Sequence, residues 1–405
     1  MRTSSLCFSL LLVACTPAPI ATDAASGDDA GSDAGHDAAR SDAGPDSFAR
    51  DASWSDAGME HTDYGSAGPH PVGNVRVTMV DRTAARMLPV EIWYPAAESA
   101  RVAATTGQPL TAFEQGTAHA TALSDLAARA PTTCIRAQTR SAAAPAAATP
   151  TAPWPAVVFS HCHGCMRFDV AEVAERLASH GIVVAAPDHL EDTHWDTTLA
   201  PLDGTYLAVR ASDVSSVLDR LLDATAAEVP VDLRGHIDAA HVGVMGHSYG
   251  AITTGAVVMS DARFVAALAI AAPLSAFGAH VADIHVPYLF VLAQEDNSIG
   301  SVGDRVIRAD YAAIGGPAWL VEVADAGHFS FSDIAGLHSS WNAGCGMGMR
   351  QDVPHAAFTY IDNVAARELA SDVAAAFFAS TLLGDPAAVN ELSALDVPAY
   401  VSMHD

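Results

Sequence analysis

Short apolar runs alternate with helical patterns through the middle of the chain. Runs of strand length lie at residues 156–160, 182–186, 242–245, 265–271, 288–293 and 319–323. Between and after them, segments of helical length lie at residues 169–180, 206–227, 251–259, 304–314 and 356–383. Strands that are apolar throughout must be covered on both faces, which is typical of parallel sheets. The pattern therefore predicts an α/β fold, in which helices cover both faces of a mostly parallel sheet.

The segments that flank this alternation are less regular. Residues 74–80 and 88–94 have the composition of strands and are joined across Asp81-Arg82-Thr83, which predicts a hairpin. Residues 96–153 are rich in Ala, Thr and Pro, so we expect an irregular insertion there, with one helix at about 118–129. We expect one folded domain over residues 65–385, followed by a C-terminal tail at 386–405.

The N-terminus has the features of an export signal. Arg2 supplies a positive charge, and the apolar run at residues 6–14 is too short to cross a membrane. The run ends in Leu12-Val13-Ala14-Cys15, which resembles the lipobox of bacterial lipoproteins, whose cysteine becomes the acylated first residue of the mature protein. The resemblance implies a signal peptide at residues 1–14. An ordinary secretory signal with an incidental cysteine is the alternative.

Acylation would anchor Cys15 to a membrane surface, because lipid chains contribute about 0.8 kcal/mol per buried CH₂ group. Thr16 stands where an Asp would resemble the signal for inner-membrane retention, so in a Gram-negative host we expect the outer rather than the inner membrane of the cell envelope. The following residues, to position 64, hold eleven acidic side chains against Arg40 and Arg50. Such a composition cannot bury a core, and its like charges extend it. We expect residues 15–64 to be a disordered tether.

The charge balance excludes several classes of function. The 405 residues carry a formal net charge of -27, with an isoelectric point of about 4.8. Nucleic acid is not an expected partner, because phosphate binding needs clustered Lys and Arg. All twenty basic residues are Arg. A Walker-type phosphate loop, a Schiff-base enzyme and a Ser-x-x-Lys site are therefore excluded, since each of them needs a Lys.

We expect no cofactor. Gly344, Gly346 and Gly348 imitate part of a dinucleotide fingerprint, but no strand pattern precedes them and no βαβ pattern surrounds them. We interpret them as loop residues.

The five residues Gly246-His247-Ser248-Tyr249-Gly250 carry the strongest chemical signal in the chain. They form a G-x-S-x-G motif between a predicted buried strand and a predicted buried helix. A sharp turn from strand to helix exposes the serine hydroxyl at the edge of a sheet, and glycines permit that turn. We therefore predict that Ser248 is a nucleophile. A structural tight turn is the alternative.

A serine nucleophile needs a base, and the base needs an acid to orient it. With this type of elbow the acid and the histidine follow the serine in chain order, on loops after later strands. Asp296 follows the strand at 288–293 and His328 follows the strand at 319–323, so we predict that they are the acid and the base. Glu295 is the nearest competitor for the acid, and Asp325 lies close to His328 in sequence.

An oxyanion produced at the serine needs two N–H donors. The backbone N–H of Tyr249, just after the nucleophile, is the first expected donor. The second should come from the loop after the strand at 156–160, where we predict the backbone N–H of His163, with Cys162 as the alternative.

These motifs together resemble the α/β-hydrolases, in particular dienelactone hydrolase-like proteins, platelet-activating-factor acetylhydrolases and bacterial cutinase-like polyester hydrolases. The resemblance covers residues 75–384 and is carried by four stretches. They are Val90-Glu91-Ile92-Trp93-Tyr94-Pro95, Phe159-Ser160-His161 leading into 177–186, the elbow, and Ala326-Gly327-His328-Phe329-Ser330. It implies an α/β-hydrolase fold and hydrolysis of a small-molecule or polymer ester.

The chain departs from these relatives at two places. In the acetylhydrolases the acid follows the strand just after the elbow, whereas here that position holds Ala271-Ala272. The acid is therefore expected from Asp296, as in the polyester and dienelactone branches. The usual His-Gly-x-Gly oxyanion loop is replaced by His161-Cys162-His163-Gly164, and the Cys restricts the backbone beside the expected donor.

Four cysteines lie outside the signal: Cys134, Cys162, Cys165 and Cys345. In an exported protein an even number suggests disulfides, and four cysteines allow three connectivities. We hypothesise a bond from the oxyanion loop to Cys345 or Cys134 that braces the site. The loop could also be interpreted as a metal or redox site, but its ligands crowd one short segment without a second pair, so we expect no metal.

The sequence thus predicts a serine hydrolase that cleaves carboxylic esters through an acyl-enzyme intermediate. A serine peptidase or amidase would use the same three residues. A catalytically inactive surface-binding lipoprotein would need one of them to be missing, and all three are present. The oligomeric state is left open.

Overall fold

The computed structural model describes residues 63–101, 108–134, 153–353, 355–395 and 399–404. The expected signal peptide, Cys15 and almost the whole expected tether lie outside these ranges. Tyr64, at the expected end of the tether, is buried, and its hydroxyl donates a hydrogen bond of 2.9 Å to Asp385 Oδ2. Within the described residues, no helix combines the length and the apolar character needed to cross a membrane.

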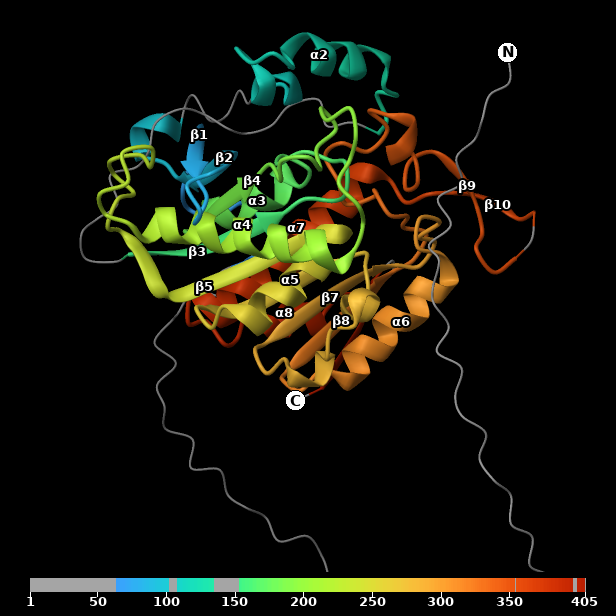
Figure 1. Cartoon of the computed structure of the whole chain (residues 1–405). Coiled ribbons are helices and arrows are strands. Elements are labelled where there is room, and N and C mark those ends of the chain that lie inside the picture. The colour runs from blue at the N-terminus through green and yellow to red at the C-terminus, as the bar shows by residue number, and fades with distance from the viewer. Residues whose placement is uncertain (1–62, 102–107, 135–152, 354, 396–398, 405) are drawn as a thin grey trace, which may run out of the picture. The chain divides into compact units, whose positions relative to one another are not determined.

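Nine strands form one sheet in the order β1-β2-β4-β3-β5-β6-β7-β8-β11 (Figure 1). The six strands from β4 to β8 run parallel, and β1, β2 and β11 join antiparallel at the two edges. The strands are β1 (Val72–Val80), β2 (Met87–Pro95), β3 (Trp154–Ser160), β4 (Val183–Pro187), β5 (Ile237–His247), β6 (Phe264–Ile270), β7 (Tyr288–Ala293), β8 (Ala318–Val323) and β11 (Ala399–His404). The predictions of a mostly parallel sheet and of an N-terminal hairpin are confirmed.

Helices cover both faces of the sheet, because its central strands are apolar on both sides. On β3, Val157 and Phe159 pack into one core and Ala156 and Val158 into the other. The first core includes side chains of α3 (Ala171–Ser179), α7 (Asn363–Leu382) and α8 (Val389–Ser393). The second includes side chains of α4 (Gly204–Leu222), α5 (Tyr249–Ser260) and α6 (Gly300–Ala313). This arrangement brings the loops at the carboxyl ends of the parallel strands to one edge.

The C-terminal segment differs from the expectation. The predicted tail at 386–405 instead contains α8 and the edge strand β11, which pairs with β8 from Ala399 to His404. Pairing satisfies backbone groups that would otherwise be exposed at the edge of β8. Residues 356–383, expected to be helical throughout, begin with the strand β10 (Ala357–Thr359), which pairs with β9 (Met347–Met349) before α7 starts. The sequence pattern did not predict β9, β10 or β11 as strands, because these segments are short and only partly apolar.

The described part of the insertion is more ordered than expected. It contains α2 (Ala120–Arg129), close to the predicted helix, and 3-10 helices at Glu98–Ala100 and Leu110–Glu114. Outside the insertion, 3-10 helices lie at Leu274–Phe277, Val281–Asp283 and Ser339–Trp341. The rest of the insertion falls outside the described residues.

A buried arginine attaches the insertion to the sheet. Arg167, in the loop after β3, contacts Glu91 of β2 at 3.0 Å, Glu114 at 2.7 Å and Asp188 at 2.9 Å. It also donates a hydrogen bond to the carbonyl of Phe113 at 2.6 Å. Three carboxylates share this one cation. Burial raises the pKa of Glu91 from 4.5 to about 7, although the facing guanidinium acts in the opposite direction.

This shift makes the stability of the fold depend on pH. Glu91 binds its proton more tightly in the folded than in the unfolded chain, so its contribution is full below pH 4.5 and is lost as the pH rises to about 7. Compared with Glu91→Gln, the wild type should lose about 3 kcal/mol of unfolding free energy across this window. Urea unfolding at pH 4.5, 5.5, 6.5 and 7.5 measures the difference. Glu98→Gln, at an exposed ion pair, is the matched control, and parallel curves for Glu91→Gln and wild type would contradict the shift.

Candidate active site

Ser248 lies on a sharp turn between a strand and a helix. β5 ends at His247 and α5 begins at Tyr249, and Ser248 itself has φ 56° and ψ −119°, a conformation that is costly for a residue with a side chain. The flanking glycines are required by close backbone contacts. A Cβ on Gly246 would lie 2.1 Å from the carbonyl oxygen of Gly250, and a Cβ on Gly250 would lie 1.8 Å from that of Ser160. The turn leaves the Ser248 side chain partly exposed.

The structure brings the three predicted side chains together. His328 Nε2 lies 2.8 Å from Ser248 Oγ, and His328 Nδ1 lies 2.7 Å from Asp296 Oδ2. Asp296 also accepts hydrogen bonds at Oδ1 from the backbone N–H groups of Ser298 (2.9 Å) and Ile299 (3.1 Å), which fix its orientation. A carboxylate that accepts from Nδ1–H leaves Nε2 free to accept the serine proton. Both His328 and Asp296 are buried.

The competing acids are engaged elsewhere. Arg350 contacts Glu295 at 2.8 Å and forms a second, short ion pair with Asp325. Among the described contacts, neither carboxylate reaches His328. Asp296 is therefore the carboxylate that contacts His328 in the structure.

The loop after β3 carries the predicted second oxyanion donor. Within the described residues no hydrogen bond engages the backbone N–H of His163, whereas the N–H of Cys162 is directed to Asp169 at 3.3 Å. The ring of His163 is held by Asp192, with Nδ1 at 2.5 Å from the carboxylate. Tyr249 is the first residue of α5, where a backbone N–H has no intrahelical acceptor. The geometry therefore favours the N–H of His163 over that of Cys162 as the second oxyanion donor beside Tyr249.

A second Ser-His-Asp relay, which the sequence did not indicate, lies inside the core. Ser160 Oγ lies 2.9 Å from His189 Nε2, and His189 Nδ1 lies 3.0 Å from Asp213 Oδ2. Ser160 and His189 are 0% exposed and Asp213 is 1% exposed. Burial lowers the pKa of His189 well below its usual value and raises that of Asp213 to about 7. Because no substrate can reach a fully buried hydroxyl, this relay serves the structure.

The same serine also lacks the features of a nucleophile. Ser160 ends a strand without an elbow, and its Oγ accepts a hydrogen bond from Arg210 Nη2 at 3.1 Å. Ser160 ends β3, His189 follows β4 and Asp213 lies on α4, and no G-x-S-x-G pattern marks this serine in the sequence.

The four cysteines form two disulfides, Cys134–Cys345 and Cys162–Cys165. The hypothesis of a bond from the oxyanion loop to Cys134 or Cys345 is therefore wrong. Cys162 and Cys165 are only three residues apart, and a turn brings their Cα atoms to 5.2 Å, within the usual range for a disulfide. Cys134 and Cys345 join the insertion to the loop between β8 and β9. Asp169 lies beside Cys162 and Cys165, but cysteines joined in a disulfide offer no thiolate to a metal.

Two family models match parts of the chain. The model described as platelet-activating factor acetylhydrolase, isoform II, matches residues 59–201, which end before the elbow. The model of the dienelactone hydrolase family matches residues 143–333, which include Ser248, Asp296 and His328. A search of curated proteins gave no match.

The chain also resembles a solved structure, the ferulic acid esterase from Streptomyces cinnamoneus. The two superpose with a TM-score of 0.57 and 23% sequence identity, over 84% of this chain and 98% of that one. At this identity the likeness concerns the fold.

The disulfide connectivity can be checked by peptide mapping without reduction. Cleavage after Arg should give the peptide 130–136 joined to the peptide 309–350 through Cys134 and Cys345. Cys162 and Cys165 lie in one peptide, 141–167, whose mass should be about 2 Da lower than that of its reduced form because its own two cysteines are bonded. A cross-link between 141–167 and either of the other two peptides would contradict the structure.

Proposed function

The chain is an ester hydrolase of the α/β-hydrolase type, and from this premise we propose that Ser248 is its nucleophile, His328 its general base and Asp296 the acid that orients the base. The observation that carries the proposal is the hydrogen-bonded relay at the elbow. Its two contacts are 2.8 Å and 2.7 Å, and it ends on a serine that is partly exposed. The buried relay at Ser160 has similar distances but no access.

The geometry supports acyl transfer in two steps. His328 Nε2 takes the Ser248 proton as Oγ attacks the ester carbonyl carbon, and the N–H groups of Tyr249 and His163 receive the oxyanion. His328 then returns the proton to the alcohol oxygen, the C–O bond breaks, and the acyl group remains on Ser248. Water, deprotonated by the same imidazole, then attacks the acyl carbon. His328 returns this proton to Ser248 Oγ as the acyl–Oγ bond breaks, which releases the carboxylic acid product and restores the free serine. A correctly placed oxyanion donor is worth about 10²- to 10³-fold in kcat.

The proposed substrate is a small-molecule or polymer carboxylic ester. The related proteins are named as an acetylhydrolase, a dienelactone hydrolase and a ferulic acid esterase. Ester substrates are common to these names, which supports an ester rather than an amide. Ala271 and Ala272, after β6, offer no carboxylate, so the acid follows β7. This supports the dienelactone-type arrangement, whose family model also spans all three residues.

The two Ser-His-Asp relays supply a matched test. Ser248→Ala should lower kcat on p-nitrophenyl acetate or butyrate by about 10⁴- to 10⁶-fold, because the nucleophile is lost. Ser160→Ala removes the same hydroxyl from the buried relay. It should keep most of kcat while lowering the unfolding free energy by about 1 kcal/mol. Retained activity in Ser248→Ala, or the loss of activity in Ser160→Ala alone, would sink the assignment.

The two rival functions give different results in the same preparation. A peptidase or amidase would cleave matching p-nitroanilides as well as p-nitrophenyl esters, whereas an esterase would cleave only the esters at a measurable rate. An inactive binding protein would leave Ser248 unlabelled by a fluorophosphonate probe. We expect ester cleavage and labelling that disappears in Ser248→Ala.

We also propose that the chain is exported and anchored to a membrane through Cys15. This proposal can be tested without measuring activity. The lipobox-like sequence supports this, and so do the two disulfides, because such bonds persist in oxidising compartments outside the cytosol. In a bacterial host, labelled palmitate should enter the wild type and be absent from Cys15→Ser. Equal labelling of both proteins, or of neither, would exclude this anchor.

A further inference from the structure

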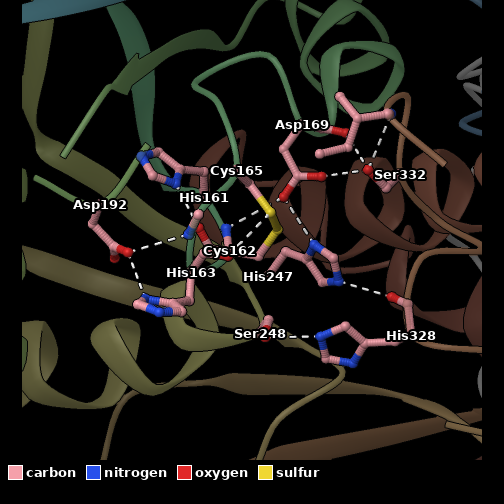
Figure 2. Close-up of a disulfide and its surroundings, with 12 residues drawn as sticks. His161, Cys162, His163, Cys165, Asp169, Asp192, His247, Ser248, His328 and Ser332 are labelled. Carbon is pink, nitrogen blue, oxygen red and sulfur yellow. Dashed lines mark hydrogen bonds and ion pairs between the residues drawn. A yellow bond between two sulfur atoms is a disulfide. The ribbon is translucent and has the colours of Figure 1, made fainter. Parts of the chain in front are cut away.

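His247, the variable residue before the nucleophile, is buried between two hydrogen-bond acceptors. Its Nδ1 lies 2.8 Å from Asp169 Oδ2, and its Nε2 lies 2.8 Å from the backbone carbonyl oxygen of His328 (Figure 2). His247 is 1% exposed and Asp169 is 0% exposed. A motif of the type G-x-S-x-G makes no demand on this position, so these contacts call for a separate explanation.

The contacts fix the protonation of the pair. A carbonyl oxygen only accepts hydrogen bonds, so Nε2 must carry a hydrogen. An ionised carboxylate also only accepts, so Nδ1 must carry one as well, and the ring is an imidazolium. Burial alone would raise the pKa of Asp169, but the facing charge and hydrogen bond of His247 hold it below its usual value. Burial alone would lower the pKa of His247, but Asp169 raises it above the usual value.

Asp169 also joins the three loops that carry the site. Its Oδ2 accepts from the backbone N–H of Cys162 at 3.3 Å, beside the proposed oxyanion donor. Its Oδ1 accepts a short hydrogen bond from Ser332, and its backbone carbonyl accepts from the N–H of Asp333 at 2.8 Å. Ser332 and Asp333 follow His328 on the loop after β8. One buried carboxylate thus contacts the oxyanion loop, the elbow and the loop of the base.

We propose that the buried Asp169–His247 ion pair is a positioning pair, which holds the backbone of His328 so that its imidazole faces Ser248. The proposal rests on the assignment of Ser248 and His328 as nucleophile and base. His247 is adjacent to Ser248 in the chain and bonded to the backbone of His328, so it fixes the distance between the two elements. Its side chain is buried, and it contacts the site through the backbone carbonyl of His328 and through the His328 ring, whose centroid lies 5.0 Å from that of His247. It therefore acts on the proton transfer and not on substrate binding.

Two amide substitutions separate the two contacts of His247. The Asn amide nitrogen stands as many bonds from Cβ as Nδ1 does, so His247→Asn can keep the bond to Asp169 but not the one to His328. The Gln amide nitrogen corresponds to Nε2, so His247→Gln can keep the donor to the His328 carbonyl. We expect His247→Asn to lower kcat about 10²-fold and His247→Gln less than about tenfold, with KM nearly unchanged in both. A purely structural role predicts no preference for Gln in kcat.

The matched control lies on the same strand. His241 contacts Asp238 at 2.8 Å through Nδ1, but this pair is exposed and lies away from the loops of the site. His241→Asn should leave kcat unchanged. Equal kcat losses in His247→Asn and His247→Gln, or no loss in His247→Asn, would overturn the proposal.

A measurement on the wild-type protein keeps the proposal testable if the variants do not fold. At pH 7.5, above the ordinary pKa of histidine near 6.5, the ¹⁵N spectrum of His247 should show hydrogens on both ring nitrogens. A ring with one bare nitrogen would overturn the ion pair. Ser248→Ala is assayed alongside. If it retains the activity of the wild type, the proposed function fails, whereas the ring spectrum still decides the protonation of His247.

Discussion

The active edge of the sheet depends on how closely the elbow backbone approaches the end of β3. Gly250, in the first turn of α5, lies so near the carbonyl of Ser160 that no Cβ fits between them. The same contact brings the loop that follows Ser160 next to Ser248, the proposed nucleophile. The two proposed oxyanion donors, one at Tyr249 and one at His163, are therefore positioned by a single backbone contact between the first turn of α5 and the end of β3.

A second constraint is the burial of charge beneath these loops. Arg167 binds three carboxylates and fixes the insertion, while Arg210 of α4 holds Asp192 and the carbonyl of His161. Arg210 also lies over the ring of Tyr249, with its Cζ atom 4.7 Å from the ring centroid. Breaking a buried pair by removing one partner typically costs about 3 to 5 kcal/mol. These networks therefore hold the loops of the site rigidly, in a chain whose only basic residues besides histidine are arginines.

The two Ser-His-Asp relays have similar hydrogen-bond distances, so these distances alone do not select the serine that we propose as the nucleophile. Both have serine, imidazole and carboxylate within hydrogen-bond distance. They differ in the backbone that carries the serine and in access. Ser248 lies on a turn with positive φ and is partly exposed, whereas Ser160 ends a regular strand inside the core. The strained backbone of Ser248 is held by the close packing at Gly246 and Gly250 and by the hydrogen bond from its N–H to the carbonyl of Ile270 at 2.8 Å.

The sequence by itself determined the α/β class, the elbow at Ser248 and the positions of Asp296 and His328. The periodicity of apolar residues reports burial directly, and chain order on a parallel sheet places the ends of successive strands at one edge. The tertiary structure decided what depends on contacts between distant elements. It gave the pairing of Cys162 with Cys165, the strand β11 in the expected tail, the buried relay at Ser160 and the Asp169–His247 pair. The local sequence pattern does not predict these features, because each depends on how distant elements pack and on which buried polar groups must find hydrogen-bond partners.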